Sequence, residues 1–382
     1  MKKNKLYFVV GAGPSGLTAS IKIKELNNDN QVILIDKNDS IGKKIKVSGN
    51  GKCNLANINT NIDLINNSTY CHELFQDGYQ KINNFFSETL GILLFTDENG
   101  LVYPNSLTSE TLISSYLEKI SSLGISLKLE EEFLSFTSEI NQILVKTTKD
   151  TYLVDYLVFA TGGRTYYKNY NNNVIRELEK YSVKYEDFIP SLTGYLLKES
   201  VKELSKKRIK GTIKLTSNNE IIYSELGEIQ FKDDGISGIN VMNSSCYYAK
   251  LKDKSKCKLF IDFYPTLEKE TLDLLIKKRE INNFLKGSLP LEFYKYLIKN
   301  NKVLTLDILK NYPFTINGVY SFDYAQVSEG GIILNEINSN YSLKKVPNVF
   351  VLGELINASF ICGGYNIMHA VLSALKMVEN LK

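Results

Sequence analysis

The sequence predicts an α/β protein in which a Rossmann-like domain is built from both ends of the chain and is interrupted by an inserted domain. Three observations support this class. The apolar run 6–10 ends in the glycine-rich segment 11–16, which opens a helical pattern. The apolar run 153–160 is typical of a parallel strand that is covered on both faces, and 349–352 is a further short strand near the end of the chain. Past Pro190, short alternating runs indicate an antiparallel sheet followed by helices.

The amino-terminal stretch carries a dinucleotide-binding pattern. Gly11, Gly13 and Gly16 form a G-x-G-x-x-G turn between a strand and a helix, and Asp36 ends a second strand 20 positions past Gly16. Gly11 permits the tight turn, Gly13 admits a pyrophosphate close to the backbone, and Gly16 lets the helix pack on the strand. The amides and positive end of the helix then face the phosphates. Asp36 can accept two hydrogen bonds from an adenosine ribose, and no arginine directly follows it, which favours FAD or NAD over NADP.

The next loop, 41–54, is dense in glycine, lysine and small polar residues. Beside a dinucleotide fold it can wrap phosphate and ribose with amides and ammonium groups, although a solvated connector is the alternative. The strand at 153–160 ends in 161–163, with a glycine pair where open α/β sheets place their ligand.

A second glycine-rich region lies near the carboxyl end. Gly353 and Glu354 follow the strand 349–352, and the segment 362–366 opens a last helix. Two such loops suit a cofactor held at both ends. FAD fits, because Glu354 can reach the ribityl chain and the helix directs its positive end toward the N1/O2 edge of the flavin. A plain NAD dehydrogenase would not need the second loop.

Composition narrows the class further. A chain of 382 residues suggests two or three domains of about 100–200 residues each, and we place them at 1–190, 191–320 and 321–382, the outer two forming one domain. A net charge of +4 on 46 basic and 42 acidic residues gives no general reason to expect nucleic acid or anionic lipid as a partner. The amino-terminal apolar run is too short for a signal peptide, and no run reaches the ~18 residues of a membrane span. Five scattered cysteines and two histidines give no metal-ligand set and indicate a reducing cytoplasm.

Several motifs together resemble one family. Gly-Ala-Gly-Pro-Ser-Gly at 11–16, Ser-Gly-Asn-Gly-Lys-Cys-Asn at 48–54, Ala-Thr-Gly-Gly at 160–163, Gly-Ile-Ser-Gly at 235–238 and Gly-Gly-Tyr-Asn at 363–366 look like the HI0933-like bacterial flavoproteins. That family includes NAD(P)/FAD-dependent and aminoacetone-oxidase-family enzymes and a bile-acid dienone reductase. The resemblance implies tightly bound, non-covalent FAD, a two-part Rossmann-like domain and an inserted β-barrel-plus-helical domain.

The chain departs from the family pattern at three places. The segment 357–362 replaces an aspartate- and glycine-rich stretch, 367–369 replaces a Gln-Trp pair, and Tyr166-Tyr167 replaces Tyr-Pro. The FAD assignment does not depend on these positions, but a substrate carried over from a relative would.

The residues expected to contact the cofactor lie mostly in these loops and strand ends. They are Gly11, Gly13, Pro14, Ser15, Gly16, Asp36, Lys37, Lys43, Lys44, Ser48, Gly49, Asn50, Gly51, Cys53, Asn54, Phe133, Thr161, Gly162, Gly163, Gly353, Glu354, Gly363, Gly364, Tyr365 and Asn366. The flavin itself would carry out the redox step. The candidates for added chemistry are Cys53, Cys362, His369 and Tyr365, with Tyr103 as a further acid, and each is weighed against a packing role.

The leading interpretation is an FAD-dependent oxidoreductase that transfers a hydride between flavin N5 and a small organic substrate. No second G-x-G-x-x-G is present, so NAD(P)H, if it is the reductant, would dock in an open cleft between the domains. A flavin-containing RNA-binding or RNA-modifying protein is the alternative. It would use the basic run 202–210, but Glu199 and Glu203 at helical spacing favour a solvated face instead. Gly235 to Gly238 lack the G-x-S-x-G pattern of a nucleophile elbow, which disfavours a hydrolase.

Overall fold

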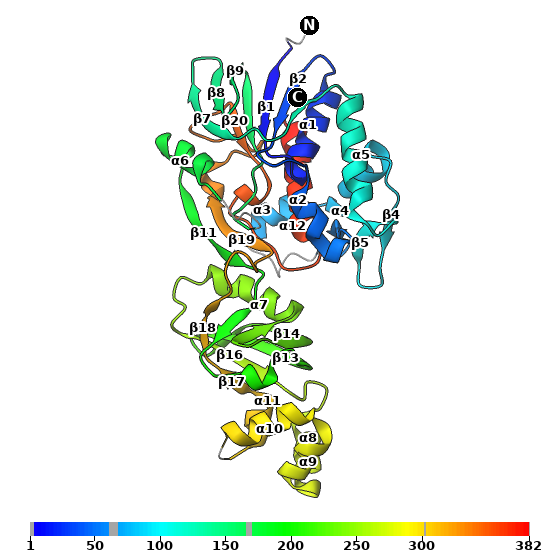
Figure 1. Ribbon diagram of the computed structural model, residues 1–382, viewed down its shortest axis with the longest axis vertical. Helices are drawn as coiled ribbons and strands as arrows, with labels where there is room; N and C mark the ends of the chain where they lie inside the picture. Colours follow the sequence, from blue (N-terminus) through cyan, green and yellow to red (C-terminus); the bar gives the residue numbers. More distant parts are fainter. Residues whose placement is uncertain (1–3, 61–67, 166–169, 302, 382) are drawn as a thin grey trace. The chain divides into compact units, whose positions relative to one another are not determined.

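The computed structural model describes residues 4–60, 68–165, 170–301 and 303–381. Within these ranges the main sheet has five parallel strands in the order β20-β10-β1-β2-β6. Figure 1 labels β20, β1 and β2 of this sheet. They are β1 (Leu6–Val10), β2 (Gln31–Ile35), β6 (Ser126–Lys128), β10 (Tyr156–Phe159) and β20 (Val349–Val351). β20 is therefore separated from β1 only by β10, although more than 300 residues of chain lie between them. The predicted Rossmann-like α/β class is confirmed.

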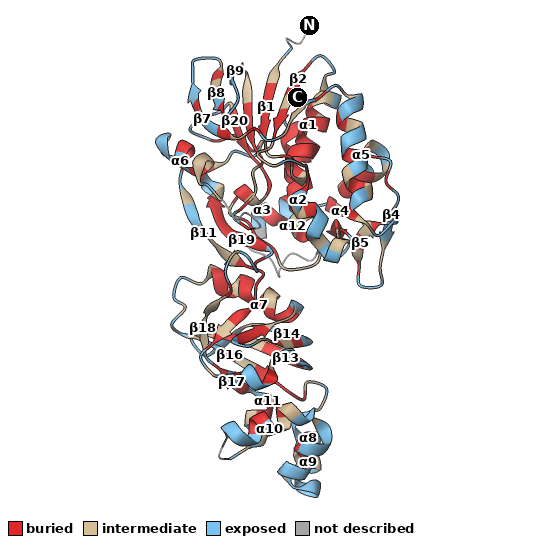
Figure 2. Cartoon of the chain, viewed as in Figure 1, coloured by how far each residue is buried: buried red, intermediate tan, exposed pale blue. Residues whose placement is uncertain are grey.

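Two helices, α1 (Pro14–Leu26) and α12 (Tyr365–Glu379), pack against each other beside this sheet. Pro14 suits the first turn of α1, because its fixed φ is helical and the N–H that it lacks would have no partner within the helix. Leu17 and Ile21 are fully buried, and each such burial stabilises the fold by about 1.5–3 kcal/mol. Eleven of the 15 residues of α12 are buried, so this helix is covered on most sides (Figure 2). No helix in the described ranges combines the length and apolar character that crossing a bilayer requires.

Smaller elements surround this core. They form three further sheets, β3-β5-β4, β7-β8-β9 and β11-β19, together with short helices. Their bounds are α2 (Lys43–Val47), η1 (Ser48–Gly51), β3 (Ala56–Asn57), α3 (Ser68–Phe75), α4 (Gly78–Asn84), η3 (Phe85–Thr89), β4 (Leu94–Thr96), β5 (Leu101–Pro104), α5 (Ser109–Ser122), β7 (Phe133–Ser138), β8 (Ile143–Thr147), β9 (Thr151–Val154), α6 (Asn173–Lys180), β11 (Tyr185–Ser191), β19 (Val327–Ile332), η5 (Leu334–Glu336) and η6 (Gly353–Leu355).

Two local expectations differ from the structure. The loop expected at 41–54 contains the short helix α2 and the 3-10 turn η1. The single strand expected at 153–160 is two strands, β9 and β10, which separate at Asp155. Its carboxylate accepts the backbone N–H of Leu6 at 2.8 Å and the ammonium of Lys5 at 3.2 Å, so this residue ties the chain to the start of β1. Tyr166 and Tyr167 lie outside the described residues.

The chain divides into two compact units, 1–188 with 327–382, and 189–326. Each unit has its own cluster of buried apolar residues. The sequence placed the boundaries at 190 and 320. The elements of the second unit are β12 (Tyr195–Leu197), η4 (Lys202–Leu204), β13 (Arg208–Ser217), β14 (Glu220–Phe231), β15 (Gly235–Ser237), α7 (Ile239–Lys250), β16 (Cys257–Asp262), α8 (Lys269–Arg279), α9 (Ile281–Ser288), α10 (Leu291–Asn300), α11 (Leu306–Lys310), β17 (Tyr312–Phe314) and β18 (Ile316–Val319).

The sheet of the second unit has the order β17-β16-β13-β14-β15-β12-β18. The two edge strands, β17 and β18, follow each other directly in the sequence. The two edges of the sheet are therefore close together, and the sheet is barrel-like. Its observed pairings are antiparallel, as the alternating runs predicted. The helical spacing proposed for 199–210 was wrong, because only Lys202–Leu204 forms a short 3-10 turn and β13 begins at Arg208.

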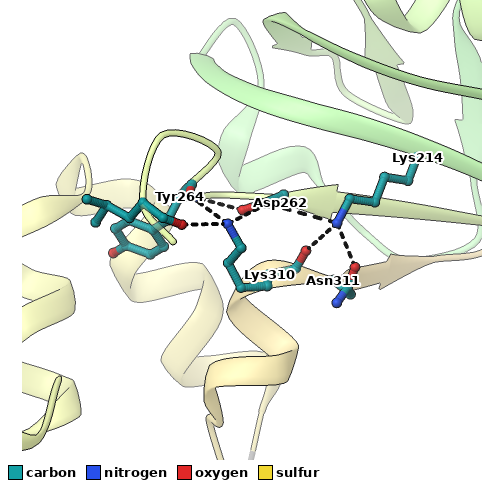
Figure 3. Close-up of polar contacts among 6 residues, drawn as sticks. Lys214, Asp262, Tyr264, Lys310 and Asn311 are labelled. Carbon is teal, nitrogen blue, oxygen red and sulfur yellow. Dashed lines mark hydrogen bonds and ion pairs between the residues drawn. The ribbon is translucent and has the colours of Figure 1, made fainter. Parts of the chain in front are cut away.

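A polar network joins three elements of this unit (Figure 3). Asp262, at the end of β16, is buried, and its Oδ2 lies 2.8 Å from Nζ of Lys310 and 3.9 Å from Nζ of Lys214. The backbone N–H of Tyr264 donates to Oδ1 of the same carboxylate at 2.9 Å. Lys214, on β13, also donates to Oδ1 of Asn311 at 2.8 Å, and burial lowers the pKa of its ammonium. The network therefore ties α11 to β13 and β16.

Candidate cofactor site

The amino-terminal glycine turn leaves an open space at the start of α1. Gly11 has φ +107°, and a β-carbon there would lie 2.5 Å from the carbonyl oxygen of Ala160, so only glycine fits. A β-carbon on Gly16 would lie 1.9 Å from the carbonyl oxygen of Gly11. A β-carbon on Gly13, by contrast, would meet no atom of the described chain within 4 Å. Gly13, at the N-cap of α1, has no side chain to cap the first turn, so the N–H groups and positive end of this helix can face an anion in this space.

Asp36 is largely engaged by the protein. Its Oδ2 accepts the backbone N–H of Ala12 at 2.8 Å, and its Oδ1 accepts the backbone N–H and the side-chain amide of Asn38 at 2.9 and 2.7 Å. A carboxylate offers about four acceptor positions. In this arrangement three are taken, which leaves room for one ribose hydroxyl where sequence reasoning allowed two. The adjacent Lys37 is half-buried.

The loop after α2 lies against the amino end of α12. Left-handed backbone at Asn50 and Cys53, with φ of +53° and +62°, folds this loop. A β-carbon on Gly364 would lie 2.6 Å from the carbonyl oxygen of Ala56 and 2.7 Å from Oδ1 of Asn54. That asparagine oxygen is buried, and no donor within the described ranges reaches it. Because a buried acceptor without a donor costs about 1–3 kcal/mol, this atom suits an N–H or O–H of a bound ligand.

A cluster around Glu354 joins four distant segments. Its Oε2 lies 2.9 Å from Nζ of Lys44 on α2, and its Oε1 accepts the backbone N–H of Ser328 on β19 at 2.9 Å. The hydroxyl of Ser328 in turn accepts the backbone N–H of Arg164 at 2.9 Å. A β-carbon on Gly163 would lie 2.6 Å from Oε1 of Glu354, so bare backbone borders the carboxylate there.

The two glycine-rich ends of the chain meet. A β-carbon on Gly353 would lie 2.8 Å from Oγ of Ser15, in the first turn of α1. The backbone N–H of Gly353 donates to Oγ of Ser373 on α12 at 3.1 Å. The structure thus brings the amino-terminal turn and the carboxyl-terminal loops together, as a ligand gripped from both ends requires.

His369 is enclosed by the protein. It is 1% exposed, and its Nε2 lies 2.9 Å from the hydroxyl of Tyr70. The hydroxyl of Tyr341 donates to the Tyr70 oxygen at 3.4 Å, so His369, Tyr70 and Tyr341 form one hydrogen-bonded chain. Burial lowers the pKa of His369 to about 3, which keeps the imidazole neutral. Among the roles considered, packing is the one this geometry supports.

The other chemical candidates are also constrained. The hydroxyl of Tyr365 donates to the carbonyl oxygen of Asn59 at 2.6 Å. Cys53 is fully buried, and burial raises the pKa of its thiol to about 11, which disfavours the reactive thiolate. Cys362 is half-exposed. Tyr103, also half-exposed, has a ring carbon 3.7 Å from the β-carbon position of Gly49, and burial raises its pKa.

Three further residues that were predicted to contact the cofactor interact with nearby parts of the protein. Lys43 is exposed and pairs with Asp39 at 3.0 Å, one turn earlier. The ring of Phe133 is buried and packs edge-on against Phe159, with 5.0 Å between ring centroids. Asn366 closes the loop before α12 through hydrogen bonds to the backbone of Phe360.

The remaining predicted residues lie around these loops. The hydroxyl of Ser48 donates to the carbonyl oxygen of Ile45 at 2.8 Å, which closes the end of α2. A β-carbon on Gly51 would meet no described atom within 4 Å, and Thr161 is half-buried beside Gly162. A β-carbon on Gly162 would lie 3.6 Å from Nζ of Lys44.

Sequence reasoning missed Ser328. It expected a strand at 330–334, whereas β19 spans Val327–Ile332 and is buried throughout. A serine two residues before the glycine pair 330–331 was the available signal, because a buried polar residue in a strand needs a partner.

The protein has a parallel sheet, and glycine turns from both ends of the chain meet near the amino end of α1, where an anion can bind. These features define a Rossmann-type dinucleotide-binding protein. The HI0933-like protein Rossmann domain family matches residues 5–379, so the chain belongs to that family. Membership places the protein among FAD-dependent oxidoreductases in general terms.

Similar proteins agree with this class. The chain is 24% identical to the 3-dehydro-bile acid delta(4,6)-reductase of Clostridium scindens over 95% of each chain. It is also 24% identical to the ribosomal RNA dihydrouridine synthase of Escherichia coli, over 98% of this chain and 97% of the relative. Among solved structures, 3-ketosteroid delta1-dehydrogenase from Sterolibacterium denitrificans aligns with a TM-score of 0.52 at 11% identity and covers 99% of both chains. At that identity the structural likeness shows the fold alone.

Proposed function

We propose that the protein is an FAD-dependent reductase of an activated carbon–carbon double bond in a small organic substrate, with NAD(P)H as reductant. The observation that carries the proposal is the convergence of the two glycine-rich ends of the chain around Glu354, Asn54 and the first turn of α1.

The residues present fit an extended FAD. The uncapped N–H groups of α1 beside Gly13 suit its pyrophosphate, and the remaining acceptor capacity of Asp36 suits its adenosine ribose. Glu354 would accept a hydroxyl of the ribityl chain. The unpaired Oδ1 of Asn54 and the amino end of α12 at Gly364 suit the polar edge of the flavin ring.

The two relatives are named for the same type of reaction. A delta(4,6)-reductase acting on a 3-dehydro compound and a dihydrouridine synthase both saturate a carbon–carbon double bond conjugated to a carbonyl group. Flavin supplies the hydride for such a step when it is bound, and the protein supplies position and polarity. With flavin bound, one carbon of the double bond would receive a hydride and its neighbour a proton from solvent, and NAD(P)H would supply the two electrons that return the flavin to its reduced form.

The test is anaerobic stopped-flow spectroscopy of the FAD-loaded protein. NADH or NADPH is expected to bleach the visible absorbance of the oxidised flavin. Mixing the reduced protein with 2-cyclohexen-1-one, a simple conjugated enone, is expected to restore that absorbance. A colourless protein that also fails to take up added FAD would remove the basis of the proposal.

A second candidate is an RNA-modifying reductase, with a uridine in RNA as the activated alkene. It is favoured by the dihydrouridine synthase relative and by the charge of the second unit. Residues 189–326 contain 22 Lys and Arg against 16 Asp and Glu, a net charge of +6, whereas the rest of the chain carries −2. Part of this excess is locally neutralised, because Lys207 pairs with Glu292 and Arg208 pairs with Glu228.

Retention of ribosomal RNA on a filter, measured against salt concentration, distinguishes the two candidates. RNA recognition through the basic run requires binding that weakens steeply with salt and a slope reduced by about 2–3 when Lys206, Lys207 and Arg208 are changed to Gln. Equal retention of the wild type and the triple variant would leave the small-molecule reductase as the better description.

A further inference from the structure

Lys44 and Glu354 form an ion pair at the candidate cofactor site. They are 310 positions apart in sequence, and their side chains are 23% and 18% exposed. The carboxylate is fixed at both oxygens, because Lys44 holds Oε2 and the backbone N–H of Ser328 holds Oε1, each at 2.9 Å.

The surroundings leave this carboxylate little freedom. Gly163 places backbone where any side chain would collide with Oε1, and Ser328 is itself tied through its hydroxyl to the backbone N–H of Arg164. A partly desolvated pair held in this way is less screened than a pair in open solvent. The orientation of Glu354 is therefore set by contacts within the protein.

The sequence had placed Lys44 in a loop that wraps phosphate. In the structure its ammonium points to Glu354, and Gly162 lies beside it with its β-carbon position 3.6 Å from Nζ. The other lysines of α2 have different surroundings. Lys43 pairs with the exposed Asp39, and Lys46 is exposed on the same short helix.

We propose that Lys44 is a positioning residue for Glu354, and that Lys44 and the backbone of Ser328 together form a clamp which presents the Glu354 carboxylate to a hydroxyl of the bound flavin nucleotide. Lys44 thus contributes to cofactor affinity through the carboxylate and not through the phosphates. The inference rests on the proposed FAD binding. Within that site it assigns the contact with the flavin nucleotide to Glu354 and the orientation of Glu354 to Lys44.

A double-mutant cycle on the dissociation constant of FAD tests the clamp. The four proteins are the wild type, Lys44→Met, Glu354→Gln and the double variant, each first freed of FAD and then titrated by quenching of FAD fluorescence. Each single change is expected to weaken FAD binding by about 10- to 100-fold, as loss of a hydrogen bond to a charged group does. The double variant is expected to bind within about threefold of Glu354→Gln alone, because Lys44 has nothing left to position.

A second measurement avoids changing Glu354. Riboflavin has the ribityl chain but no phosphate, so Lys44→Met is expected to weaken riboflavin binding by the same factor as FAD binding. Lys46→Met is the matched control, since it removes the same charge from an exposed position of the same helix. It is expected to change the FAD dissociation constant less than twofold. Circular dichroism of each FAD-free variant checks that it is folded.

The outcomes separate the clamp from the proposed function. If the effects of Lys44→Met and Glu354→Gln multiply in the double variant, or if Lys44→Met leaves riboflavin binding unchanged, Lys44 acts on the phosphates and the clamp is wrong while FAD binding stands. If the wild type itself takes up no FAD, the proposed function fails and the clamp fails with it.

Discussion

Two glycines in one turn have different physical roles. Gly11 needs its left-handed φ of +107° and has no room for a β-carbon, whereas Gly13 has φ −89° and open space around its β-carbon position. Glycine at 11 is thus a requirement of the fold. At 13 the fold accepts a side chain, and only an approaching ligand would exclude it.

Valine substitutions at these two positions should therefore give opposite results. Gly13→Val is expected to keep the melting temperature of the FAD-free protein within a few degrees and to weaken FAD binding at least about 100-fold, because the side chain fills the pyrophosphate path. Gly11→Val is expected to destabilise the fold itself by about 3 kcal/mol or more. Undiminished FAD occupancy in folded Gly13→Val would reject the placement of the pyrophosphate.

His369 gives the protein a specific pH dependence. Its pKa falls from 6.5 to about 3 on folding, so between those values the unfolded chain binds a proton that the folded chain does not. Stability from this residue is therefore complete above pH 6.5 and decreases as the pH falls, by up to about 1.4 kcal/mol per pH unit.

Urea unfolding of the wild type and of His369→Leu at pH 4.5, 5.5 and 7 measures this effect. Loss of the Tyr70 partner is expected to destabilise the variant at pH 7, and the gap is expected to narrow as the pH falls, because the variant lacks the titrating group. A gap that stays constant across these pH values would show that His369 titrates normally in the folded protein.

At the scale of single residues, sequence reasoning succeeded where the constraint is local. The glycines of the first turn belong to one strand–turn–helix unit, so their spacing alone identified them. The partners of His369 and Tyr365 are Tyr70 and Asn59, which lie 299 and 306 positions away. No local pattern connects residues so far apart, and for this reason neither the hydrogen-bond partner of His369 nor that of Tyr365 could be read from the sequence.

At the scale of elements, α2 shows what periodicity leaves open. In the sequence, Lys43 and Lys44 are equivalent members of a glycine-rich loop. In the structure they lie on different faces of a short helix, so Lys43 pairs with Asp39 and Lys44 pairs with Glu354. The segment is only five residues long. A helix of one turn has too few residues to show an amphipathic pattern, so its two faces become distinct only in the folded protein.

The polar network at the end of β16 makes a prediction for the second unit. Lys310→Met removes the closest cation from buried Asp262 and also two hydrogen bonds from its ammonium to the carbonyl oxygens of Tyr264 and Leu267. Breaking a buried pair on one side typically costs 3–5 kcal/mol. Because Lys214 remains 3.9 Å away, we expect about 3 kcal/mol, measured by urea unfolding with circular dichroism.

Lys269→Met is the matched control, since Lys269 pairs with Asp307 at 2.7 Å but both side chains are mostly exposed. It is expected to leave the urea midpoint unchanged. FAD affinity should be the same in both variants, because the network lies wholly within 189–326. An equal loss of stability in the two variants would contradict the importance assigned to the buried carboxylate.

At the scale of the whole molecule, the site exists because the ends of the chain share one sheet. β20 adds beside β10, which brings Gly353 against Ser15 and the start of α12 against Asn54. The class of fold could be predicted from strand patterns and glycine spacing. The contribution of β19 through Ser328 could not, because that strand pairs with β11 outside the main sheet and carries no motif.

Hydrogen exchange can test whether both ends hold the same ligand. Amides at 11–16, 48–54 and 360–366 come from remote parts of the sequence, and each segment contains residues assigned to the proposed FAD site. A ligand that binds only the folded state must be released before the protein around it can open locally. Its binding free energy therefore adds to the free energy of that opening. We therefore expect saturating FAD to slow exchange in all three segments together by at least about tenfold, with the same dependence on FAD concentration.

Strands β13 and β14, in the other unit, serve as the internal reference. Protection confined to 11–16 and 48–54 would mean that the carboxyl-terminal loops do not touch the cofactor, and the assignment of Glu354 and Gly364 to the flavin would then be wrong.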